Sequence, residues 1–363
     1  MMKVHIVGAG LLGTSIGMAI TARGAQVRFS DLSARSLELA QGLVNRDLPA
    51  TDEWEGPADL LIAAVPTAQV SAVIIDAFRR NLALNFTDVA SVKTKCVAEV
   101  EEFDPKLARS YCGGHPMAGR EVSGPESAQA DLFDGRPWIL TPTASTSTQT
   151  LNLVSGVVKA VGATEIRMAP SEHDRAVALV SHAPQIVASL MAGELLKDSS
   201  RGVALAGQGL RDVTRIAASD SQLWSGILSA NATALNPILA SMHARLAELI
   251  FSLQEAEGVS GVVDFLNQGV AGRELLPGKH GARRQYVVLP VLIDDSPGQL
   301  KRLFNDAGDA QINIEDVSME HSPGHPTGLV QISVAPDAAP ELERYLRGRG
   351  WRIYPPRNPA NLS

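Results

Sequence analysis

Residues 4–13 read Val4-His5-Ile6-Val7-Gly8-Ala9-Gly10-Leu11-Leu12-Gly13, an apolar run that leads directly into a Gly-x-Gly-x-x-Gly motif. This order predicts a strand, a tight turn and a helix, the arrangement that holds the pyrophosphate of a dinucleotide. We expect Gly8 to permit the turn, Gly10 to let the backbone approach the pyrophosphate, and Gly13 to allow close packing of helix on strand. Leu11 and Leu12 would begin the helix, whose free N–H groups and partial positive charge face the phosphates.

The residues after this motif indicate which dinucleotide is bound. Asp31 follows at the end of the second predicted strand. A carboxylate there accepts the ribose hydroxyls of NAD and repels the 2′-phosphate of NADP. Asp31 therefore favours NAD as the cofactor. NADP is the alternative, because Arg35 could bind its 2′-phosphate. Val65 and Pro66 end the next strand at the crevice, where contact with the cofactor and a plain strand-ending turn are alternative interpretations.

Short apolar runs alternate with helical patterns up to residue 168. This rhythm predicts an α/β fold, a doubly wound parallel sheet of the Rossmann type over residues 1–168. The strand-like runs lie at 4–7, 27–30, 60–65, 86–89, 138–141 and 165–168, and the clearest helical patterns at 33–44 and 67–80.

Strand signals nearly vanish after residue 168. Residues 169–260 are therefore predicted to form an all-helical domain for substrate binding and dimerisation. Its clearest helix would take Asn236 as N-cap and Pro237 as first helical residue, with apolar residues at helical spacing after them. Such a helix favours a homodimer interface, and a self-contained helical core is the alternative.

The last part of the chain differs in composition and in its predicted secondary structure. Residues 261–284, rich in glycine and basic side chains, are interpreted as a helix remnant and linker. Residues 285–354 then alternate in the order βαββαβ, which predicts a small ferredoxin-like sandwich.

Composition excludes several classes of function. The net charge of -7 and the pI near 5.7 argue against nucleic acid as a partner. Two cysteines, Cys96 and Cys112, form no CxxC pair, which argues against a disulfide framework and a metal site and fits a reducing compartment. The sequence shows no apolar run of the length that a membrane span needs. A cytoplasmic protein without a membrane or metal partner is expected.

Two further segments carry side chains suited to catalysis. Asp88-Val89-Ala90-Ser91-Val92-Lys93 places Ser91 just beyond the carboxyl end of a strand. Gly113-Gly114-His115-Pro116 holds His115 in what we interpret as a constrained loop after a strand. Each residue also has a structural interpretation, helix capping for Ser91 and core packing for His115.

Four motifs in a fixed order resemble those of prephenate and arogenate dehydrogenases, over roughly residues 3–257. They are Ser91-Val92-Lys93, Gly114-His115-Pro116-Met117-Ala118-Gly119 with Glu121-Val122-Ser123-Gly124, Ser181-His182-Ala183-Pro184, and Asp212-Val213-Thr214-Arg215-Ile216-Ala217. The resemblance implies NAD-dependent oxidative decarboxylation of prephenate to 4-hydroxyphenylpyruvate, in tyrosine biosynthesis. It implies that His115 accepts the proton of the substrate hydroxyl and that Ser91 bonds the imidazole or that hydroxyl. The ordinary His pKa, near 6.5, suits a base at neutral pH.

The resemblance also suggests how the substrate is held. Arg215 would bind a substrate carboxylate, and a surface ion pair with Asp212 is the alternative. Glu121 and Asp212 would gate the pocket and order Arg215. Ser181 and Gln185 belong to the third motif, where many prephenate-using members have histidine in place of Gln185. The choice between prephenate and arogenate, or use of both, therefore stays open.

Three more residues match the family without a firm functional interpretation. His173-Asp174 fits the family pattern, but a pair at a helix start is the favoured interpretation. Trp224 matches an aromatic residue near the pocket, and ordinary helix packing is an equal alternative.

The C-terminal unit carries a motif of its own. Asp294-Asp295-Ser296-Pro297-Gly298-Gln299-Leu300, at its first strand-to-helix junction, resembles the DxPGxL motif of ACT domains. The resemblance implies an amino-acid effector near Asp295 and Gly298, with tyrosine as the expected one. An ACT fold used only for dimerisation is the alternative.

Two other functions compete with this hypothesis. A β-hydroxyacid dehydrogenase would need a lysine in the helical domain, and Lys197 lacks a convincing context. A non-catalytic NAD and amino-acid sensor would need neither His115 nor Ser91, whose presence argues against it.

Overall fold

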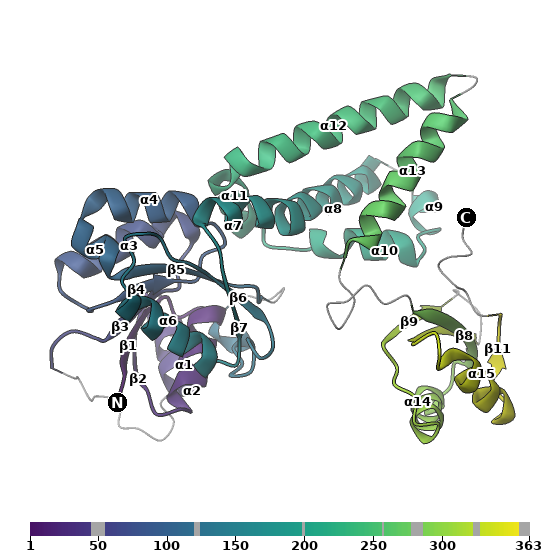
Figure 1. The fold of residues 1–363 in the computed structure, drawn as a ribbon, viewed down its shortest axis with the longest axis horizontal. Helices are drawn as coiled ribbons and strands as arrows, with labels where there is room; N and C mark the ends of the chain where they lie inside the picture. Colours follow the sequence, from purple (N-terminus) through teal and green to yellow (C-terminus); the bar gives the residue numbers. More distant parts are fainter. Residues whose placement is uncertain are drawn as a thin grey trace. The chain divides into compact units, whose positions relative to one another are not determined.

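The computed structural model describes residues 1–44, 55–119, 124–197, 200–255, 258–276, 286–321 and 327–355 (Figure 1). These residues form two compact units, Met1–Ala244 and Arg245–Ser363.

The first unit is built on a seven-stranded sheet in the order β2-β1-β3-β4-β5-β6-β7. The pairs from β2 to β5 are parallel, as predicted, and so is the pair β6–β7. The strands are β1 (Lys3–Val7), β2 (Gln26–Ser30), β3 (Leu60–Ala63), β4 (Phe86–Asp88), β5 (Tyr111–Pro116), β6 (Pro137–Thr141) and β7 (Thr164–Arg167).

The prediction of an all-parallel sheet is wrong at one pair, because β6 runs antiparallel to β5. A parallel return needs a crossover, usually a helix. The described part of segment 117–136 holds only a short 3-10 helix, η2 (Pro125–Ser127). The chain therefore turns back beside β5 and does not cross over.

Helices cover both faces of this sheet, which confirms the doubly wound layout (Figure 1). One core contains buried residues of α1 (Leu11–Thr21), α2 (Ala34–Val44) and α6 (Thr148–Ala160). A second core, on the other face, contains those of α3 (Val70–Arg79), α4 (Thr94–Phe103) and α5 (Pro105–Arg109).

The described residues from 169 to 244 form helices and loops, as predicted. A continuous helical segment begins with α7 (Pro170–Val177), passes through a π-helical turn (Ala178–His182), and ends with α8 (Ala183–Glu194) and the 3-10 turn Leu195–Lys197. The remaining elements are α9 (Ser200–Val203), α10 (Gln208–Thr214), the 3-10 turn η5 (Arg215–Ala217), α11 (Ser221–Ala230) and α12 (Ala232–Gln254).

The helical segment Pro170–Lys197 has the length and apolar composition of a membrane span. This finding corrects the sequence-based view that no stretch is long and apolar enough. The segment nevertheless carries four buried polar side chains, His173, Asp174, His182 and Gln185. Asp174 accepts hydrogen bonds from the start of α4. A core helix fits these contacts better than a helix surrounded by lipid.

The predicted start of α12 is wrong, since the helix begins at Ala232 and Pro237 lies inside it. The backbone N–H of Leu235 donates to Asn231 O, which closes the first turn before the proline. Pro237 lies beyond that turn and has no N–H to donate to the Thr233 carbonyl, so the helix lacks one i→i−4 hydrogen bond there.

The second unit contains a longer helix than the predicted helix remnant. α13 (Val259–Glu274) covers most of residues 261–276, and residues 277–285, which include the rest of the predicted linker, lie outside the described residues. A side chain at Gly261 would come within 2.4 Å of Ser252 Oγ, and one at Gly258 within 1.7 Å of Ser252 O. These glycines let the chain pack closely against α12 and do not break the helix.

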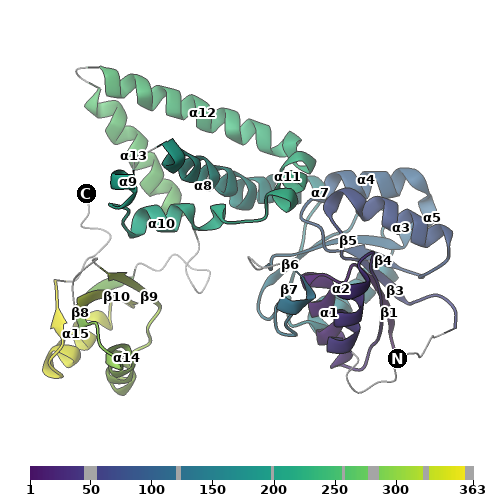
Figure 2. The ribbon, with the colours of Figure 1, turned by 180° about the vertical axis from the view of Figure 1, so that it is seen from behind.

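The C-terminal elements follow the predicted order βαββαβ (Figure 2). They are β8 (Val287–Asp294), α14 (Gln299–Asp309), β9 (Asp316–His321), β10 (Thr327–Val334), α15 (Ala339–Gly348) and β11 (Arg352–Ile353). The sheet is antiparallel in the order β11-β8-β10-β9, and both helices share one apolar core with it.

Candidate functional site

The glycine-rich turn after β1 has the geometry that the sequence predicts. Gly8 has a φ of 106°, and a side chain there would lie 2.1 Å from Ala64 O. A side chain at Gly13 would lie 2.0 Å from Gly8 O, so this residue permits close packing of α1. Nothing lies within 4 Å of the position of a side chain at Gly10. The turn is therefore tight at its ends and open in the middle, where a pyrophosphate can approach the backbone.

The other predicted cofactor residues surround this turn. Asp31, at the end of β2, accepts hydrogen bonds from Ala9 N at 2.6 Å and from Ser33 N at 2.7 Å. Leu11 and Leu12 begin α1 and are half-buried. Val65 and Pro66 follow β3, and Pro66 is the N-cap of the 3-10 helix η1 (Thr67–Gln69).

His115 lies within β5 and not in a loop, which corrects the sequence-based interpretation. All six residues of this strand are buried. A side chain at Gly114 would come within 2.6 Å of Asp88 O, and one at Gly113 within 2.5 Å of Thr141 Oγ1. The two glycines bring β5 close to its neighbours, and their low strand propensity concealed the strand in the sequence.

A chain of hydrogen bonds leads from His115 into α7. His115 Nδ1 lies 2.8 Å from His173 Nε2, and the two rings meet edge to face with centroids 5.0 Å apart. His173 Nδ1 lies 2.8 Å from Asp174 Oδ1. Among the hydrogen bonds of the described residues, His115 Nε2 has no partner, and it is the nitrogen available to a ligand.

Burial decides the protonation of His115. It lowers the pKa of His115 well below the usual 6.5, and the nearby charges of His173, Lys93 and His182 lower it further, while Asp174 raises it. The expectation of an ordinary His pKa is therefore wrong. The imidazole is neutral at pH 7 and can accept a proton.

The side chain of Asp174 caps α4 from outside that helix. Its Oδ1 accepts the N–H of Lys93 and its Oδ2 the N–H of Thr94, each at 2.8 Å. Burial by itself raises the pKa of Asp174, but hydrogen bonds from His173, Thr94 and Lys93 outweigh burial and lower the pKa. Ser91 is half-buried and is not the cap of α4, so the capping interpretation of Ser91 is wrong.

A buried ion pair supports the strand that carries His115. Lys93 Nζ contacts Asp88 Oδ1 and donates to Gly114 O at 2.8 Å, and both side chains are fully buried. Asp88 Oδ2 accepts from Tyr111 OH at 2.6 Å. The carbonyl that precedes His115 is thus fixed by a charged donor.

A second buried histidine lies nearby in the helical segment. Asn231 Nδ2 donates to Asp174 O at 2.8 Å and lies 3.0 Å from His182 Nδ1. The rings of His182 and Trp224 meet edge to face with centroids 6.1 Å apart. Burial lowers the pKa of His182 to about 4, Asp174 raises it, and His173 lowers it. Gln185, one turn further along, is also buried.

Arg215, the residue predicted to bind a substrate carboxylate, takes no part in the hydrogen bonds around His115 described above. Arg215 is exposed and begins η5, which packs against α8. Asp212 is exposed on α10 and accepts from Gln208 Nε2 at 2.8 Å. Ser181 is half-buried in the π-helical turn. Glu121 lies outside the described residues.

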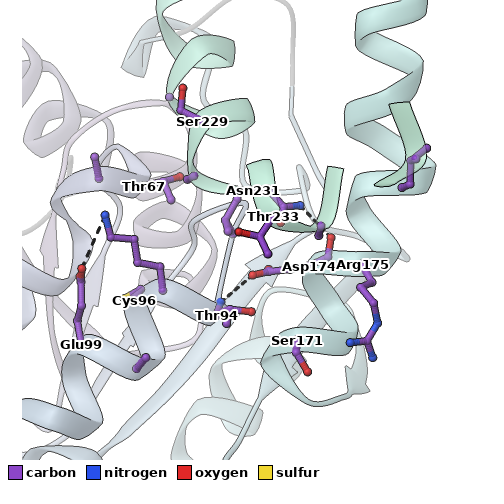
Figure 3. A pocket seen from close by; sticks show the side chains of 18 of the residues that line it. Thr67, Thr94, Cys96, Glu99, Ser171, Asp174, Arg175, Ser229, Asn231 and Thr233 are labelled. Carbon is purple, nitrogen blue, oxygen red and sulfur yellow. Dashed lines mark hydrogen bonds and ion pairs between the residues drawn. The ribbon is translucent and has the colours of Figure 1, made fainter. Parts of the chain in front are cut away.

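A cavity of about 1020 Å³ has Asp174 among its lining residues (Figure 3). Its wall includes Thr67, Thr94, Glu99, Arg175 and Ser229. Neither His115 nor the glycine-rich turn is among the residues that line it. In Figure 3 the bonds from Thr94 and Asn231 reach Asp174 at its edge.

Sequence reasoning undervalued three of these residues. The sequence favours a helix-start pair for His173 and Asp174, whereas in the structure they are buried and bonded to His115 and to the start of α4. Their adjacency after Pro170 was the available signal. Asn231 gave no signal, since it looks like any polar residue between two helices.

Two other sequence interpretations can be placed on the structure. Lys197 is exposed and paired with Glu194 at 2.7 Å, which does not suit the lysine of a β-hydroxyacid dehydrogenase. Gly298 has a φ of 92° and is the N-cap of α14, and Asp295 is exposed beside it.

Comparison with known proteins identifies the family. Residues 16–167 match the model "Prephenate dehydrogenase, nucleotide-binding domain", and residues 169–266 match "Prephenate dehydrogenase, dimerization domain". A probable prephenate dehydrogenase of Streptomyces niveus is 33% identical, covering 95% of this chain and 98% of its own length. A cyclohexadienyl dehydrogenase of Zymomonas mobilis is 30% identical, covering 70% of this chain and 89% of its own.

Solved structures agree with these matches. The prephenate dehydrogenase of A. aeolicus, in complex with hydroxyphenyl propionate and NAD+, is 27% identical with a TM-score of 0.63. The match covers 75% of this chain and 97% of that one. The glycine-rich turn, the buried His115 and the helical segment beside it thus occur in a chain that belongs to the prephenate dehydrogenase family.

Proposed function

We propose that this protein is an NAD-dependent prephenate dehydrogenase that converts prephenate to 4-hydroxyphenylpyruvate, CO₂ and NADH in tyrosine biosynthesis. The observation that carries the proposal is the neutral, buried His115, whose Nε2 is available to a substrate in the same unit as the glycine-rich turn. The S. niveus and A. aeolicus relatives support the same activity.

The residues of the glycine-rich turn fit NAD. The pyrophosphate would lie over Gly10, where the space is open, and against the first N–H groups of α1 at Leu11 and Leu12. Gly8 and Gly13 shape the turn, and Asp31 would accept the ribose hydroxyls. Val65 and Pro66 would border the nicotinamide half. NADP is the less favoured alternative, because the carboxylate of Asp31 repels a 2′-phosphate.

The protein's own task in the reaction is to orient the ring and move one proton. His115 Nε2 accepts the proton of the ring hydroxyl as the carbonyl forms, and Ser91 donates a hydrogen bond to that oxygen. When bound, NAD+ accepts the hydride from the carbinol carbon, while the ring carboxylate leaves as CO₂. Formation of the aromatic ring drives the step, so positioning accounts for most of the catalysis.

The substrate carboxylates require a cation. Arg215 would bind one of them with its guanidinium, ordered by Asp212 and gated by Glu121. Ser181 and Gln185 would line the pocket from the helical segment. Gln185 adds no positive charge, so use of arogenate, or of both substrates as in a cyclohexadienyl dehydrogenase, is the second candidate.

The C-terminal sheet supports a regulatory role. Its βαββαβ order and strand order are those of a ferredoxin-like sandwich, and the turn at Asp295 and Gly298 resembles an ACT effector site. Tyrosine would bind there and inhibit the enzyme. The protein would be a homodimer, because α8 and the π-helical turn expose Leu179, Val180 and Leu190 within a region that matches a dimerization domain. The cytoplasmic location stays an expectation from the sequence.

One assay tests the activity and its main alternatives. Purified protein with NAD⁺ and prephenate should raise the absorbance at 340 nm, and parallel assays with arogenate, NADP⁺ and added tyrosine settle specificity and inhibition. His115→Asn should lower kcat by about 10²–10⁴-fold and leave NAD⁺ affinity intact. His243→Asn, at an exposed histidine, is the matched control. No reaction with either substrate and either cofactor would favour the non-catalytic sensor.

A further inference from the structure

The bonds between His115, His173 and Asp174 determine which nitrogen of each ring carries a proton. The Asp174 carboxylate is ionised and can only accept, so His173 Nδ1 donates to it. His173 is fully buried, and with its one ring proton on Nδ1 its Nε2 holds a lone pair that faces His115 Nδ1. His115 Nδ1 therefore donates to His173 Nε2.

The position of the proton on His115 Nδ1 determines the state of the other ring nitrogen, Nε2. A neutral imidazole has one N–H, and in His115 this is Nδ1–H. Its Nε2 is then an unprotonated acceptor, the form that a base needs in order to take up a hydroxyl proton. With the opposite tautomer, Nε2 would carry a hydrogen and could not accept the proton.

Asp174 is itself held in place. Its two oxygens accept the N–H groups of Lys93 and Thr94 at the start of α4, where the partial positive charge of the helix stabilises a carboxylate. Figure 3 shows the bond from Thr94. Asn231 binds the carbonyl of the same residue. The carboxylate therefore cannot rotate away from His173, and both of its oxygens remain hydrogen-bond acceptors.

Lys93 links Asp174 to the backbone beside His115 by two hydrogen bonds. Its N–H donates to Asp174 Oδ1, the same oxygen that accepts from His173 Nδ1. Its Nζ donates to Gly114 O, in the peptide that precedes His115. The imidazole and the backbone of His115 are thus tied to one carboxylate by two separate routes.

We propose that Asp174 and His173 are positioning residues that fix the tautomer and orientation of His115, so that Nε2 is always the acceptor. This proposal rests on the proposed function, in which His115 is the base. The negative charge of Asp174 also stabilises the imidazolium that forms when Nε2 takes the proton. The nearest physical parallel is the Ser-His-Asp triad, in which the carboxylate sets the histidine tautomer.

Nitrogen-15 NMR of the full-length wild-type protein with labelled histidine tests the tautomer directly. At pH 7.5 the His115 signal, assigned by its loss in His115→Asn, should show a protonated Nδ1 and an unprotonated Nε2. A protonated Nε2 would overturn the proposal. This readout does not depend on turnover, so it separates the tautomer assignment from the proposed activity.

Two variants test the catalytic consequence. In Asp174→Asn the amide can donate to His173 and reverse both tautomers, so kcat should fall by roughly 10³–10⁴-fold, as in the corresponding triad variant. His173→Phe keeps the ring shape and removes the acceptor of His115 Nδ1, so kcat should fall by about 10²-fold or more. The prephenate KM and the NAD⁺ Kd should change by less than about threefold in each.

A structural role would give different results. If Asp174 only caps α4, Asp174→Asn lowers Tm while the folded fraction keeps wild-type kcat and the same His115 nitrogen signals, and the proposal fails. If His173→Phe keeps kcat within about threefold of the wild type, the proposal fails as well. Should neither variant fold, the wild-type NMR measurement still decides the question.

Discussion

The carboxylate of Asp31 accepts a hydrogen bond of 2.6 Å from the backbone N–H of Ala9, inside the glycine-rich turn. The end of β2 and the turn after β1 are therefore joined directly. The same carboxylate accepts from Ser33 N, so its orientation is fixed before a ribose arrives. Preorganisation of this kind lowers the cost of ordering the site on binding.

Replacement of Asp31 should change the choice of cofactor. Asp31→Asn removes the charge that repels a 2′-phosphate, and Arg35 is largely exposed nearby. A charge-assisted hydrogen bond contributes about 1.5–3 kcal/mol, so kcat/KM for NAD⁺ should fall by roughly 10–100-fold while that for NADP⁺ rises. Steady-state kinetics with both cofactors measure this. Asp76→Asn, at an exposed ion pair of α3, is the control, and unchanged cofactor preference in Asp31→Asn would contradict the assignment.

Two glycines of the same turn should respond differently to alanine. A side chain at Gly10 meets nothing within 4 Å, so Gly10→Ala should fold with a Tm close to the wild type. The added methyl occupies the space proposed for the pyrophosphate, and the NAD⁺ Kd should rise by 10-fold or more. Gly8→Ala collides with Ala64 O at a φ of 106° and should lower Tm. Calorimetry and NAD⁺ titration separate the two effects. Equal NAD⁺ affinity in Gly10→Ala would place the pyrophosphate elsewhere.

The pH dependence of catalysis should reflect the buried state of His115. Burial lowers the pKa of His115 well below 6.5, and a protonated imidazole cannot accept the hydroxyl proton. The value of kcat/KM for prephenate should therefore stay flat as pH falls to 6.5 and decline only below it, since this parameter reports groups of the free enzyme. Initial rates between pH 5 and 8 check this. A decline centred at or above pH 6.5 would show that His115 is not the desolvated base described here.

Stability should also fall in mild acid. Burial, with contributions from Arg28 and Arg80, lowers the pKa of His5 to about 4, and burial lowers that of His182 to about 4 as well. The unfolded chain, with His pKa values near 6.5, binds more protons between these limits. Stability is therefore complete above pH 6.5 and is lost as pH falls toward 4. Urea unfolding at several pH values measures this, and His5→Asn should reduce the proton uptake on unfolding by about one.

Regular patterns made much of the fold predictable. The Gly-x-Gly-x-x-Gly turn, the alternation up to residue 168 and the helical texture after it each follow from local periodicity. The antiparallel return of β6 was not predictable, because the described residues between 117 and 136 hold no crossover helix and no local pattern announces this. β5 was hidden since Gly113 and Gly114 lack side chains that could reveal a strand period.

The features that the sequence did not predict depend on contacts between segments that are distant in the chain. Lys93 and Asp174 are far apart in the sequence, and nothing local shows that an aspartate of α7 caps α4. Gly261 of α13 looked like part of a linker because its close approach to Ser252 is a tertiary contact. Sequence motifs therefore located His115 and Asp31, but the partners that set their chemistry emerged only from the structure.

Exposed apolar residues on α8 make the proposed dimer testable. Leu190 is 65% exposed, within the part of the chain that matches a dimerization domain. In a symmetric dimer each substitution acts twice, and each buried leucine contributes about 1.5–3 kcal/mol. Leu190→Asp should therefore raise the dimer dissociation constant by roughly 10²–10⁴-fold, as measured by analytical ultracentrifugation. Leu84→Asp, at a 56% exposed leucine of the nucleotide-binding part, should leave the mass unchanged. If Leu190→Asp sediments like the wild type while Leu84→Asp dissociates, the interface lies on the nucleotide-binding part and not on α8.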